Sequence, residues 1–504
     1  MRVLEENKKK VLREFEQGEV TYIDLSHWTF ADRFVAFLLA IDFFAHAVRT
    51  YPNPRKKQEV PLWILICCAL QMKLHTTSSF SRLPGILASG AILSRLGYNI
   101  GMNSGGGFND KNRHDRGTPL DQDSVRKFYR DGNYLRTRGW YNRDLPSFFR
   151  SRRGFDKHGI FVLDQIHLVV PDNPHYTDVA RMPVDEHGQR IDMSGMSDEQ
   201  KKAIRFRPCY ALSELLHVFN DEAGYIVAGY QLDAGNTDEL PQGQRLIKDF
   251  VQAVGSGVMK LLIVDRGYID GKFISHVKTE YGIDIMVPLR LSMDVLKDAV
   301  RLAESGLGDP GKWKLYKRYL HRGVEFTEEV CHIRQPGIWD ECSVELHVSL
   351  MRIRCDDEAP QRYWGIATTY EPSSPAEVFD TYAKRTCIEE RHKQFKRTWN
   401  IGKFSSPNRS LVETHVLFTL LTYSLVQLYL SKKHLSDLAD KTIDTLRHEE
   451  RLGKDSVVVY GKQNFAVFDL DEYTSIVAHL QPQPREQFCT WLERFRRNGK
   501  MRTT

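Results

Sequence analysis

The feature that most constrains the fold is an alternation of strand-like and helix-like stretches between residues 159 and 281. The runs CYALSELLHVF and YIVAGYQLD are joined by NDEAG, a turn sequence, and therefore predict a hairpin. A helix at about 238–254, the run KLLIVD and a second helix at 271–281 follow. With the strand-like run GIFVLD that precedes them, the order is strand, hairpin, helix, strand and helix. This order predicts an α/β domain with a mixed sheet.

Two of the strand-like runs end on an aspartate. GIFVLD ends on Asp164 and KLLIVD ends on Asp265. Residues at the carboxyl ends of strands in an open α/β sheet face the crevice that binds ligands, and two carboxylates there can share Mg²⁺ or Mn²⁺. Taken singly, each aspartate is explained more simply by a turn or by the N-cap of the next helix.

A long helix predicted at about 376–400 supplies a third carboxylate. Steps of three or four residues place five side chains on one broad face of it, namely Tyr382, Arg385, Glu389, His392 and Lys396. Between 381 and 404, seven Lys or Arg residues accompany only two glutamates. A glutamate in this setting is either a metal ligand flanked by phosphate clamps or a partner in i,i+4 salt bridges.

The same helix carries a family resemblance. Tyr382-x2-Arg385-x3-Glu389-x6-Lys396 is similar to the Y-x2-R-x3-E-x6-K motif of bacterial transposases of the "insertion sequence four" superfamily, to which the Tn-five type of cut-and-paste transposase belongs. IVDRGYIDGKFI resembles the segment around the second aspartate of that family. The resemblance covers about 160–430. The sequence DQIHL departs from it, because the family often has small or hydroxyl residues after the first aspartate.

The resemblance implies an RNase H-like catalytic domain with a DDE triad of Asp164, Asp265 and Glu389. These carboxylates would hold two Mg²⁺ or Mn²⁺ ions per active site, with Asp164 bridging both ions, for DNA cleavage and strand transfer. The implied partner is double-stranded DNA, both the terminal inverted repeats of the element and the target. A homodimer would bind the two ends in one complex, and relatives free the element through a hairpin intermediate.

Contacts with DNA are expected from side chains on or near this helix. The residues are Tyr382, Arg385, Lys396, His392, Lys393 and Trp364. Arg385 suits a phosphate as a planar fork and Lys396 as a point charge. Trp364 is either a stacking partner for a flipped base or a packed strand residue, and His392 is expected to meet solvent or phosphate rather than metal.

Positive charge is concentrated near the amino terminus. Residues 51–160 contain 19 Lys or Arg and 8 Asp or Glu, whereas the whole chain has a net charge of only +6. Such a block predicts a polyanion-binding unit or a solvated basic surface. Within it, a short helix capped by Asp121 or Asp123 is predicted to present Arg126, Lys127 and Arg130 to DNA.

The predicted organisation has five segments. In chain order they are a mostly helical, basic DNA-end-binding region at 1–155, the first part of the catalytic domain at 156–290, a β-rich insertion at 291–360, the second part of the catalytic domain at 361–433, and a C-terminal hairpin and helix for dimerisation at 434–504. Further elements are predicted as helices at 33–49, 61–74, 84–96, 410–430 and 484–497, a loop at 99–118 and a hairpin at 457–468.

Composition narrows the class of protein. The eight cysteines include no CxxC pair, which opposes a zinc knuckle or a disulfide framework. Polar residues interrupt the apolar run at 416–430, so a buried helix is expected there rather than a membrane span. We expect a bacterial cytoplasmic, nucleoid-associated protein. A domesticated DNA-binding protein and a metal-dependent nuclease of the same fold stay as alternatives; retention of all three carboxylates opposes the first.

Overall fold

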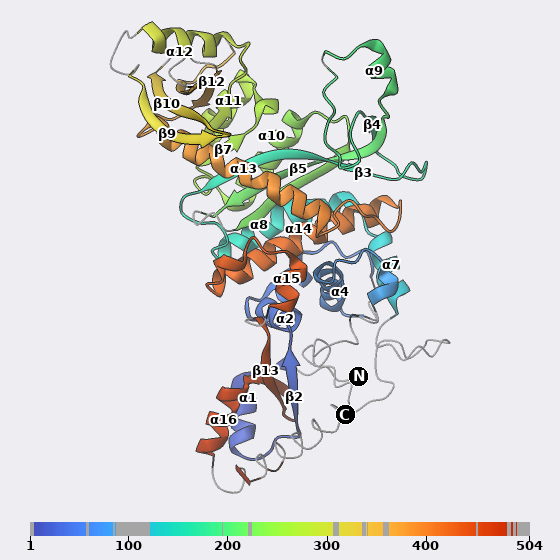
Figure 1. Cartoon of the computed structure of the whole chain (residues 1–504). Helices are drawn as coiled ribbons and strands as arrows, with labels where there is room; N and C mark the ends of the chain where they lie inside the picture. Colours follow the sequence, from blue (N-terminus) through green and yellow to red (C-terminus); the bar gives the residue numbers. More distant parts are fainter. Residues whose placement is uncertain are drawn as a thin grey trace. The chain divides into compact units, whose positions relative to one another are not determined.

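The computed structural model describes residues 5–56, 60–83, 86, 121–193, 195–219, 224–305, 312–334, 339, 341–355, 362–449, 452–480, 485–486 and 490. The chain forms two compact units (Figure 1). The terminal unit combines Met1–Gly132 with Lys441–Thr504, and the central unit is Asn133–Asp440. The central unit thus begins before residue 156, the first residue of the predicted catalytic segment.

The terminal unit contains a four-stranded sheet drawn from both ends of the chain. Its strands are β1 (Glu5–Glu6), β2 (Tyr22–Trp28), β13 (Lys454–Tyr460) and β14 (Asn464–Asp469), in the order β1-β14-β13-β2. Helices α1 (Lys8–Glu16) and α16 (Leu470–His479) pack on it through an apolar core that includes Phe15, Val459 and Tyr473. The hairpin predicted at 457–468 is confirmed. The mostly helical description of the amino-terminal region overlooked β2, which is held by pairing to β13.

The other helices of the terminal unit are α2 (Phe30–Ala40), α3 (Phe43–Thr50), α4 (Leu62–Leu74), the 3-10 turn η1 (Phe80–Arg82), α7 (Gln122–Arg130) and α15 (Ile443–His448). The single helix predicted at 33–49 is wrong, because Asp42 adopts φ 56° and separates α2 from α3. The helix predicted at 61–74 is confirmed. The predictions at 84–96 and 99–118 lie outside the described residues apart from Ile86, and so does 484–497 apart from residues 485, 486 and 490.

The central unit contains one ten-stranded sheet. Its strands are β3 (Ile160–Val169), β4 (Ala180–Met182), β5 (Arg207–Val218), β6 (Tyr225–Ala234), β7 (Leu261–Val264), β8 (Asp284–Pro288), β9 (Lys314–His321), β10 (Val324–Arg334), β11 (His347–Cys355) and β12 (Arg362–Thr368). β3, β7 and β8 are parallel neighbours, whereas β5, β6, β12 and the strands beyond β12 pair antiparallel. The predicted α/β class with a mixed sheet is confirmed.

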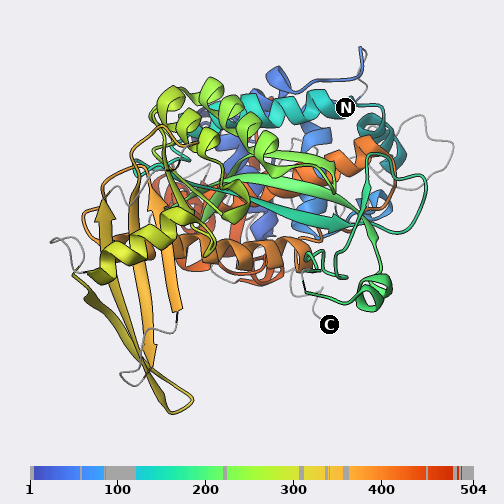
Figure 2. The same cartoon turned by 90° about the horizontal axis from the view of Figure 1, so that it is seen from above.

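The β-rich stretch predicted at 291–360 continues this sheet. β12 pairs with β8, and β11, β10 and β9 then follow in order to the edge. Figure 2 shows the β9–β10 hairpin extending away from the rest of the unit. The stretch also contains a helix that the sequence analysis missed, α12 (Asp294–Ser305).

Helices cover both faces of the sheet. The helices and 3-10 turns described in the central unit are, in chain order, α8 (Tyr134–Ser151), α9 (Asp198–Ala203), α10 (Glu239–Val254), η2 (Arg266–Tyr268), α11 (Gly271–Tyr281), α12, α13 (Pro375–Arg397), α14 (Arg409–Lys432) and η4 (Ser436–Leu438). α10 packs on Leu163, whereas α13 lies against the next residue of β3, Asp164. Because side chains alternate along a strand, α10 and α13 lie on opposite faces of the sheet.

Among the described residues, α14 is the one helix long and apolar enough to cross a membrane. Its most apolar window is entirely buried inside the protein, as in the core helix of a globular domain. The buried helix predicted at 410–430 is confirmed.

A buried ionic network fixes α14 to α8 and β6. The guanidinium of Arg138 donates to both carboxylate oxygens of Glu413 at 2.8 and 2.9 Å, and its Nη1 lies 3.0 Å from Asp233. Tyr230 donates to Glu413 at 2.8 Å, and Arg409 lies 3.1 Å from the same carboxylate. Glu413 is fully buried, so its charge depends on these partners.

We expect Arg138→Met to lower the free energy of unfolding by about 3–5 kcal/mol, because it leaves the Glu413 carboxylate buried without its bidentate partner. Arg143→Met is the matched control on the same helix, because Arg143 is 66% exposed and only 3.6 Å from Asp249. It should cost about 1 kcal/mol or less. Urea unfolding of both variants measures the difference, and equal losses would contradict a structural role for the buried network.

Candidate active site

Asp164 and Asp265 lie side by side on neighbouring strands. Leu163 of β3 pairs with Val264 of β7, and each aspartate is the next residue of its chain. Asp265 directly follows its strand, as predicted, and accepts a hydrogen bond from the backbone of Gly267 at 2.8 Å. The placement of Asp164 at a strand end is wrong, because β3 continues to Val169 by pairing with β5 after β7 has ended.

Helix α13 brings the other predicted residues to these aspartates. It begins with Pro375, and the Ser374 side chain caps it by accepting from the backbone of Glu377. The guanidinium of Arg385 then lies 3.5 Å from Asp164 and 3.4 Å from Asp265.

Glu389, one turn further along α13, lies 3.8 Å from the same guanidinium, and its side chain is 60% exposed. Arg385 therefore contacts all three predicted carboxylates.

The electrostatics at this point favour a cation. Burial and the neighbouring Asp164 raise the pKa of Asp265. Burial lowers the pKa of Arg385, but the nearby Asp164, Tyr382 and Asp265 raise it by more, so the guanidinium stays charged. In the described part of the chain, no three His, Cys, Asp or Glu side chains are gathered closely enough to hold one metal ion. The carboxylates converge instead on the positive charge of Arg385, and oxygen donors of this kind suit Mg²⁺ or Mn²⁺.

A fourth carboxylate, Glu239, lies at this site and was missed by the sequence analysis. It stands in the first turn of α10, and a Cβ added to Gly267 would come within 1.6 Å of its Oε1. The carboxylate therefore packs directly on the backbone that follows Asp265. Burial, Asp265, Asp164 and Asp238 raise the pKa of Glu239 to about 7. The helix predicted at about 238–254 includes this residue, but the sequence carries no signal that links it to Asp265.

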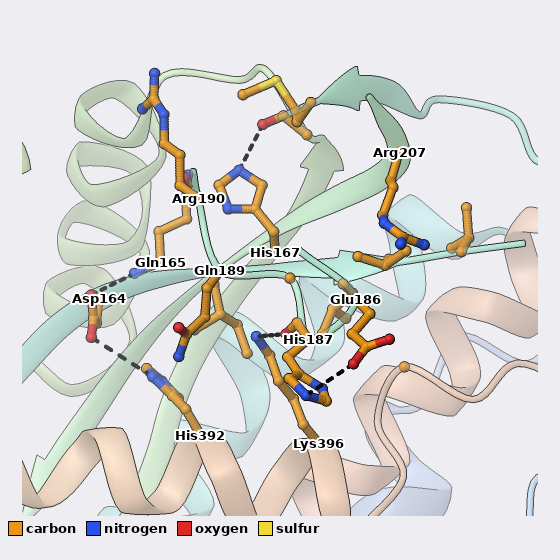
Figure 3. Close-up of a pocket in the computed structure, with 18 of the residues that line it drawn as sticks. Asp164, Gln165, His167, Glu186, His187, Gln189, Arg190, Arg207, His392 and Lys396 are labelled. Atoms are coloured by element: carbon orange, nitrogen blue, oxygen red, sulfur yellow. Dashed lines mark hydrogen bonds and ion pairs between the residues drawn. The ribbon is translucent and has the colours of Figure 1, made fainter. Parts of the chain in front are cut away.

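His392 joins Asp164 to a buried glutamate. Its Nδ1 lies 3.8 Å from Asp164, and its Nε2 lies 3.1 Å from Glu214 (the first contact is drawn in Figure 3). Glu214 is fully buried and pairs directly across from Asp164 on β5. The expectation of a solvated His392 is wrong, because its side chain is only 10% exposed. Glu214 was missed because it stands within the apolar run of β5.

The remaining predicted residues of α13 and β12 have different surroundings. Tyr382 is buried against Trp364, with ring centroids 5.6 Å apart, and Trp364 also packs on Phe379 at 5.2 Å. Trp364 therefore has the environment of a packed strand residue. Lys393 is exposed and donates to Glu390 at 2.5 Å.

Lys396 contacts a turn that faces α13. Its Nζ donates to the carbonyl of His187 at 2.6 Å. In this turn the Asp185 carboxylate accepts from the backbones of His187 and Gln189, and Gly188 adopts φ +75°. A side chain at Gly188 would meet the carbonyl of His167 on β3, so only glycine lets the turn approach the strand this closely.

The aspartates, α13 and this turn enclose a cleft of about 1470 Å³ (Figure 3). Arg385, Lys393, Lys396 and Arg397 line it from α13, and Arg190, Arg207 and Lys403 line it from other segments. Arg190, Arg207 and Lys403 form no ion pair with any residue that the structure describes. The cleft thus combines a group of carboxylates with cations free to meet a polyanion.

Arg126, Lys127 and Arg130 lie on α7 in the terminal unit. Asp121 is the N-cap of this helix, as predicted. Val125, Phe128 and Tyr129 are buried, whereas Lys127 and Arg130 are exposed and Arg126 is half-buried. The three cations therefore lie on the outward side of α7, as a DNA-contacting helix requires.

We expect the stability of the protein without metal to depend on pH through Glu239. An unfolded glutamate has a pKa of 4.5, and the folded value is about 7, so the folded state binds the proton more tightly and loses stability as the pH rises from 4.5 to 7. Glu239→Gln removes this loss, and the stability gained over the natural protein should be larger at pH 8 than at pH 5, by on the order of 1 kcal/mol after solvent screening.

Urea unfolding at the two pH values measures this difference. Glu186→Gln is the control, because Glu186 also lines the cleft but is 74% exposed. A gain for Glu239→Gln that is the same at both pH values would show that the carboxylate is not crowded by Asp164 and Asp265.

Comparison with known proteins agrees with this geometry. Residues 156–425 match the family described as the transposase DDE domain. No curated protein matches the chain. The matched region contains Asp164, Asp265, Glu389 and the cleft around them. Because it covers more than half of the sequence, this chain belongs to the transposase DDE domain family.

Proposed function

We propose that the chain is an insertion-sequence transposase of the "insertion sequence four" superfamily, with Asp164, Asp265 and Glu389 as its catalytic triad. Family membership implies a phosphoryl-transfer enzyme acting on DNA. The observation that carries the finer proposal is the position of Arg385, whose guanidinium contacts all three carboxylates from the helix with the Y-x2-R-x3-E-x6-K spacing.

The proposed fold of the catalytic domain is RNase H-like. Support comes from the strand order β6-β5-β3-β7-β8, in which β5 alone runs antiparallel to its inner neighbour β3 while β3, β7 and β8 are parallel. This arrangement puts Asp164 on β3 and Asp265 directly after the neighbouring strand β7, within reach of one helix. The triad is thus assembled from three segments far apart in the sequence.

Transposases of this family generally use divalent metal ions. The residues that would hold two Mg²⁺ or Mn²⁺ ions here are Asp164, Asp265 and Glu389. When bound, such ions activate the attacking hydroxyl or water and stabilise the leaving oxygen. The donor set fits, because its carboxylates already gather around the positive charge of Arg385, and burial and the neighbouring Asp164 raise the pKa of Asp265.

The side chains of α13 have separate proposed roles on DNA. Arg385 can exchange a carboxylate for a phosphate through its planar fork, and Lys396 can exchange the His187 carbonyl for a phosphate as a point charge. Tyr382 holds its ring against Trp364 and thereby supports Arg385 one turn away. His392, fixed by Glu214, orients Asp164 through the carboxylate oxygen that Arg385 does not contact. The free cations Arg190, Arg207 and Lys403 extend the phosphate-binding surface along the cleft.

We also propose that the terminal unit binds the ends of the element and that the active form is a homodimer holding two ends. The exposed cations of α7 support the first statement. We further propose that the enzyme acts at the nucleoid in the bacterial cytoplasm, because membership of the transposase family implies DNA as its partner.

The central test is Glu389→Gln, assayed with Mg²⁺ on DNA that carries the ends of the element. We expect cleavage and strand transfer to fall roughly a thousandfold, which corresponds to about 4 kcal/mol of transition-state stabilisation. Glu390→Gln is the matched control, because the neighbouring Glu390 is exposed and pairs with Lys393 one turn along the same helix. If the natural protein cleaves this DNA but carries out no strand transfer, it is a nuclease rather than a transposase. Undiminished cleavage by Glu389→Gln would remove the glutamate from the triad.

For the terminal unit, we expect Arg126→Gln/Lys127→Gln/Arg130→Gln to weaken binding to the ends and to reduce the salt dependence of the binding constant. Three lost phosphate contacts would lower the slope of log K against log salt by roughly 2.7. The control is Lys9→Gln/Lys10→Gln/Arg13→Gln, which removes three exposed charges from α1 of the same unit. Equal effects of both variants would argue against a specific role for α7.

A further inference from the structure

The two strands of the β9–β10 hairpin differ in charge, because β10 carries Glu325, Glu328 and Glu329 whereas β9 is basic. Between Lys312 and Arg322 the sequence KWKLYKRYLHR contains five Lys or Arg and no Asp or Glu. Most of β9 is exposed, and Lys314, Lys317, Arg318 and Arg322 form no ion pair with residues in the part of the chain that the structure describes. We propose that this hairpin is an arm that enters a groove of duplex DNA and contacts the phosphates on both sides of it.

The shape of the hairpin suits this role. β9 and β10 pair from Lys314 to the tip, where His321 pairs with Val324 across a two-residue turn. Arg322 and Gly323 both have positive φ, 51° and 82°, as in the tight turns whose twist matches a two-stranded ribbon. The result is a narrow ribbon that projects from the edge of the sheet (Figure 2). The major groove of DNA is about 12 Å wide and admits such a ribbon.

The cations are distributed as a groove requires. Lys317 and Arg318 are consecutive residues of a strand, so their side chains point to opposite faces of the ribbon. A ribbon that enters a groove tip first turns its two faces toward the two phosphate backbones. Cations on both faces can therefore contact both backbones at once.

The exposed leucines of β9 distinguish it from an edge strand whose charged side chains only prevent aggregation. Lysines on an edge strand can serve only to prevent pairing with another chain. Leu315 and Leu320 are 57% and 73% exposed, however, and apolar side chains on an edge would favour association instead. Leu320 stands two residues before the turn, directly across from Glu325 of β10. An apolar side chain there is placed to contact a thymine methyl group or to wedge between bases, as it does in other DNA-bending arms.

The base of the arm is joined to the helix that carries Glu389. Tyr316 donates to Asp380 of α13 at 2.6 Å, and its ring lies 6.2 Å from that of Phe379. DNA gripped by the arm would therefore be held at a fixed distance from the cleft within the same unit. The inference rests on the proposed action on DNA, but it concerns binding and needs no cleavage.

The experiment compares Lys317→Gln/Arg318→Gln with Lys297→Gln/Arg301→Gln in the full chain. Lys297 and Arg301 are exposed cations of α12, also in the central unit, and each is paired with an aspartate of its own helix. Affinity for duplex DNA carrying the element ends is measured without divalent metal at several salt concentrations. The arm variant should lower the salt slope by roughly 1.8 and the affinity roughly thirtyfold at 0.15 M salt, whereas the control should change neither.

A second variant, Leu320→Ser, keeps the charge of the arm. It should leave the salt slope unchanged, lower the affinity severalfold and reduce distortion of the DNA, reported by the fluorescence of 2-aminopurine placed in the bound region. Natural affinity and natural salt slope in Lys317→Gln/Arg318→Gln would overturn the inference. So would loss of self-association with unchanged DNA affinity, because the hairpin would then be a contact between protein chains.

The two proposals can fail separately. If the natural protein binds DNA through the arm but does not cleave it with Mg²⁺, the proposed function is wrong and the arm stands. If the natural protein cleaves and the arm variant binds normally, the arm is wrong and the proposed function stands.

Discussion

The central unit depends on the parallel pairing of β3 with β7, because this pairing sets two carboxylates side by side. Two like charges at one place destabilise the fold unless a cation lies between them. Arg385 supplies that cation and also contacts Glu389, so the helix and the two strands are held together by one guanidinium. The cost of bringing the carboxylates together is visible in the raised pKa values of Asp265 and Glu239. The gathered carboxylates therefore lower the stability of the fold, whereas the proposed chemistry requires them.

Much of the site could be predicted where the signal is local. Asp265 follows a short apolar run, and the face of α13 follows from steps of three and four residues. Asp164 was identified correctly as a neighbour of Asp265, but its strand was ended too early because the polar residues after it do not look like a strand. In the structure they are satisfied by side-chain contacts: Gln165 donates to Gln242 at 2.9 Å, and His167 meets the carbonyl of Gly235 at 3.0 Å. These residues are also where the sequence departs from the family pattern.

What could not be predicted depends on contacts between distant segments. Glu214 is a charged residue in an apolar run, and only the register of β5 against β3 places it across from Asp164. Glu239 approaches Asp265 because Gly267 has no side chain to keep it away. The strands at 291–360 were recognised, yet their continuation of the main sheet follows from the pairing of β12 with β8, which no local pattern encodes.

The sheet of the terminal unit pairs strands that are synthesised far apart in time. β2 leaves the ribosome early, but its partner β13 begins only at Lys454. At a synthesis rate of about 5–20 residues per second, β2 waits roughly 20–90 s for that partner. Until then its hydrogen-bonding edge stays open. A chain that stops before β13 lacks the strand that pairs with β2, so this sheet cannot form until the segment from Lys454 onward is present.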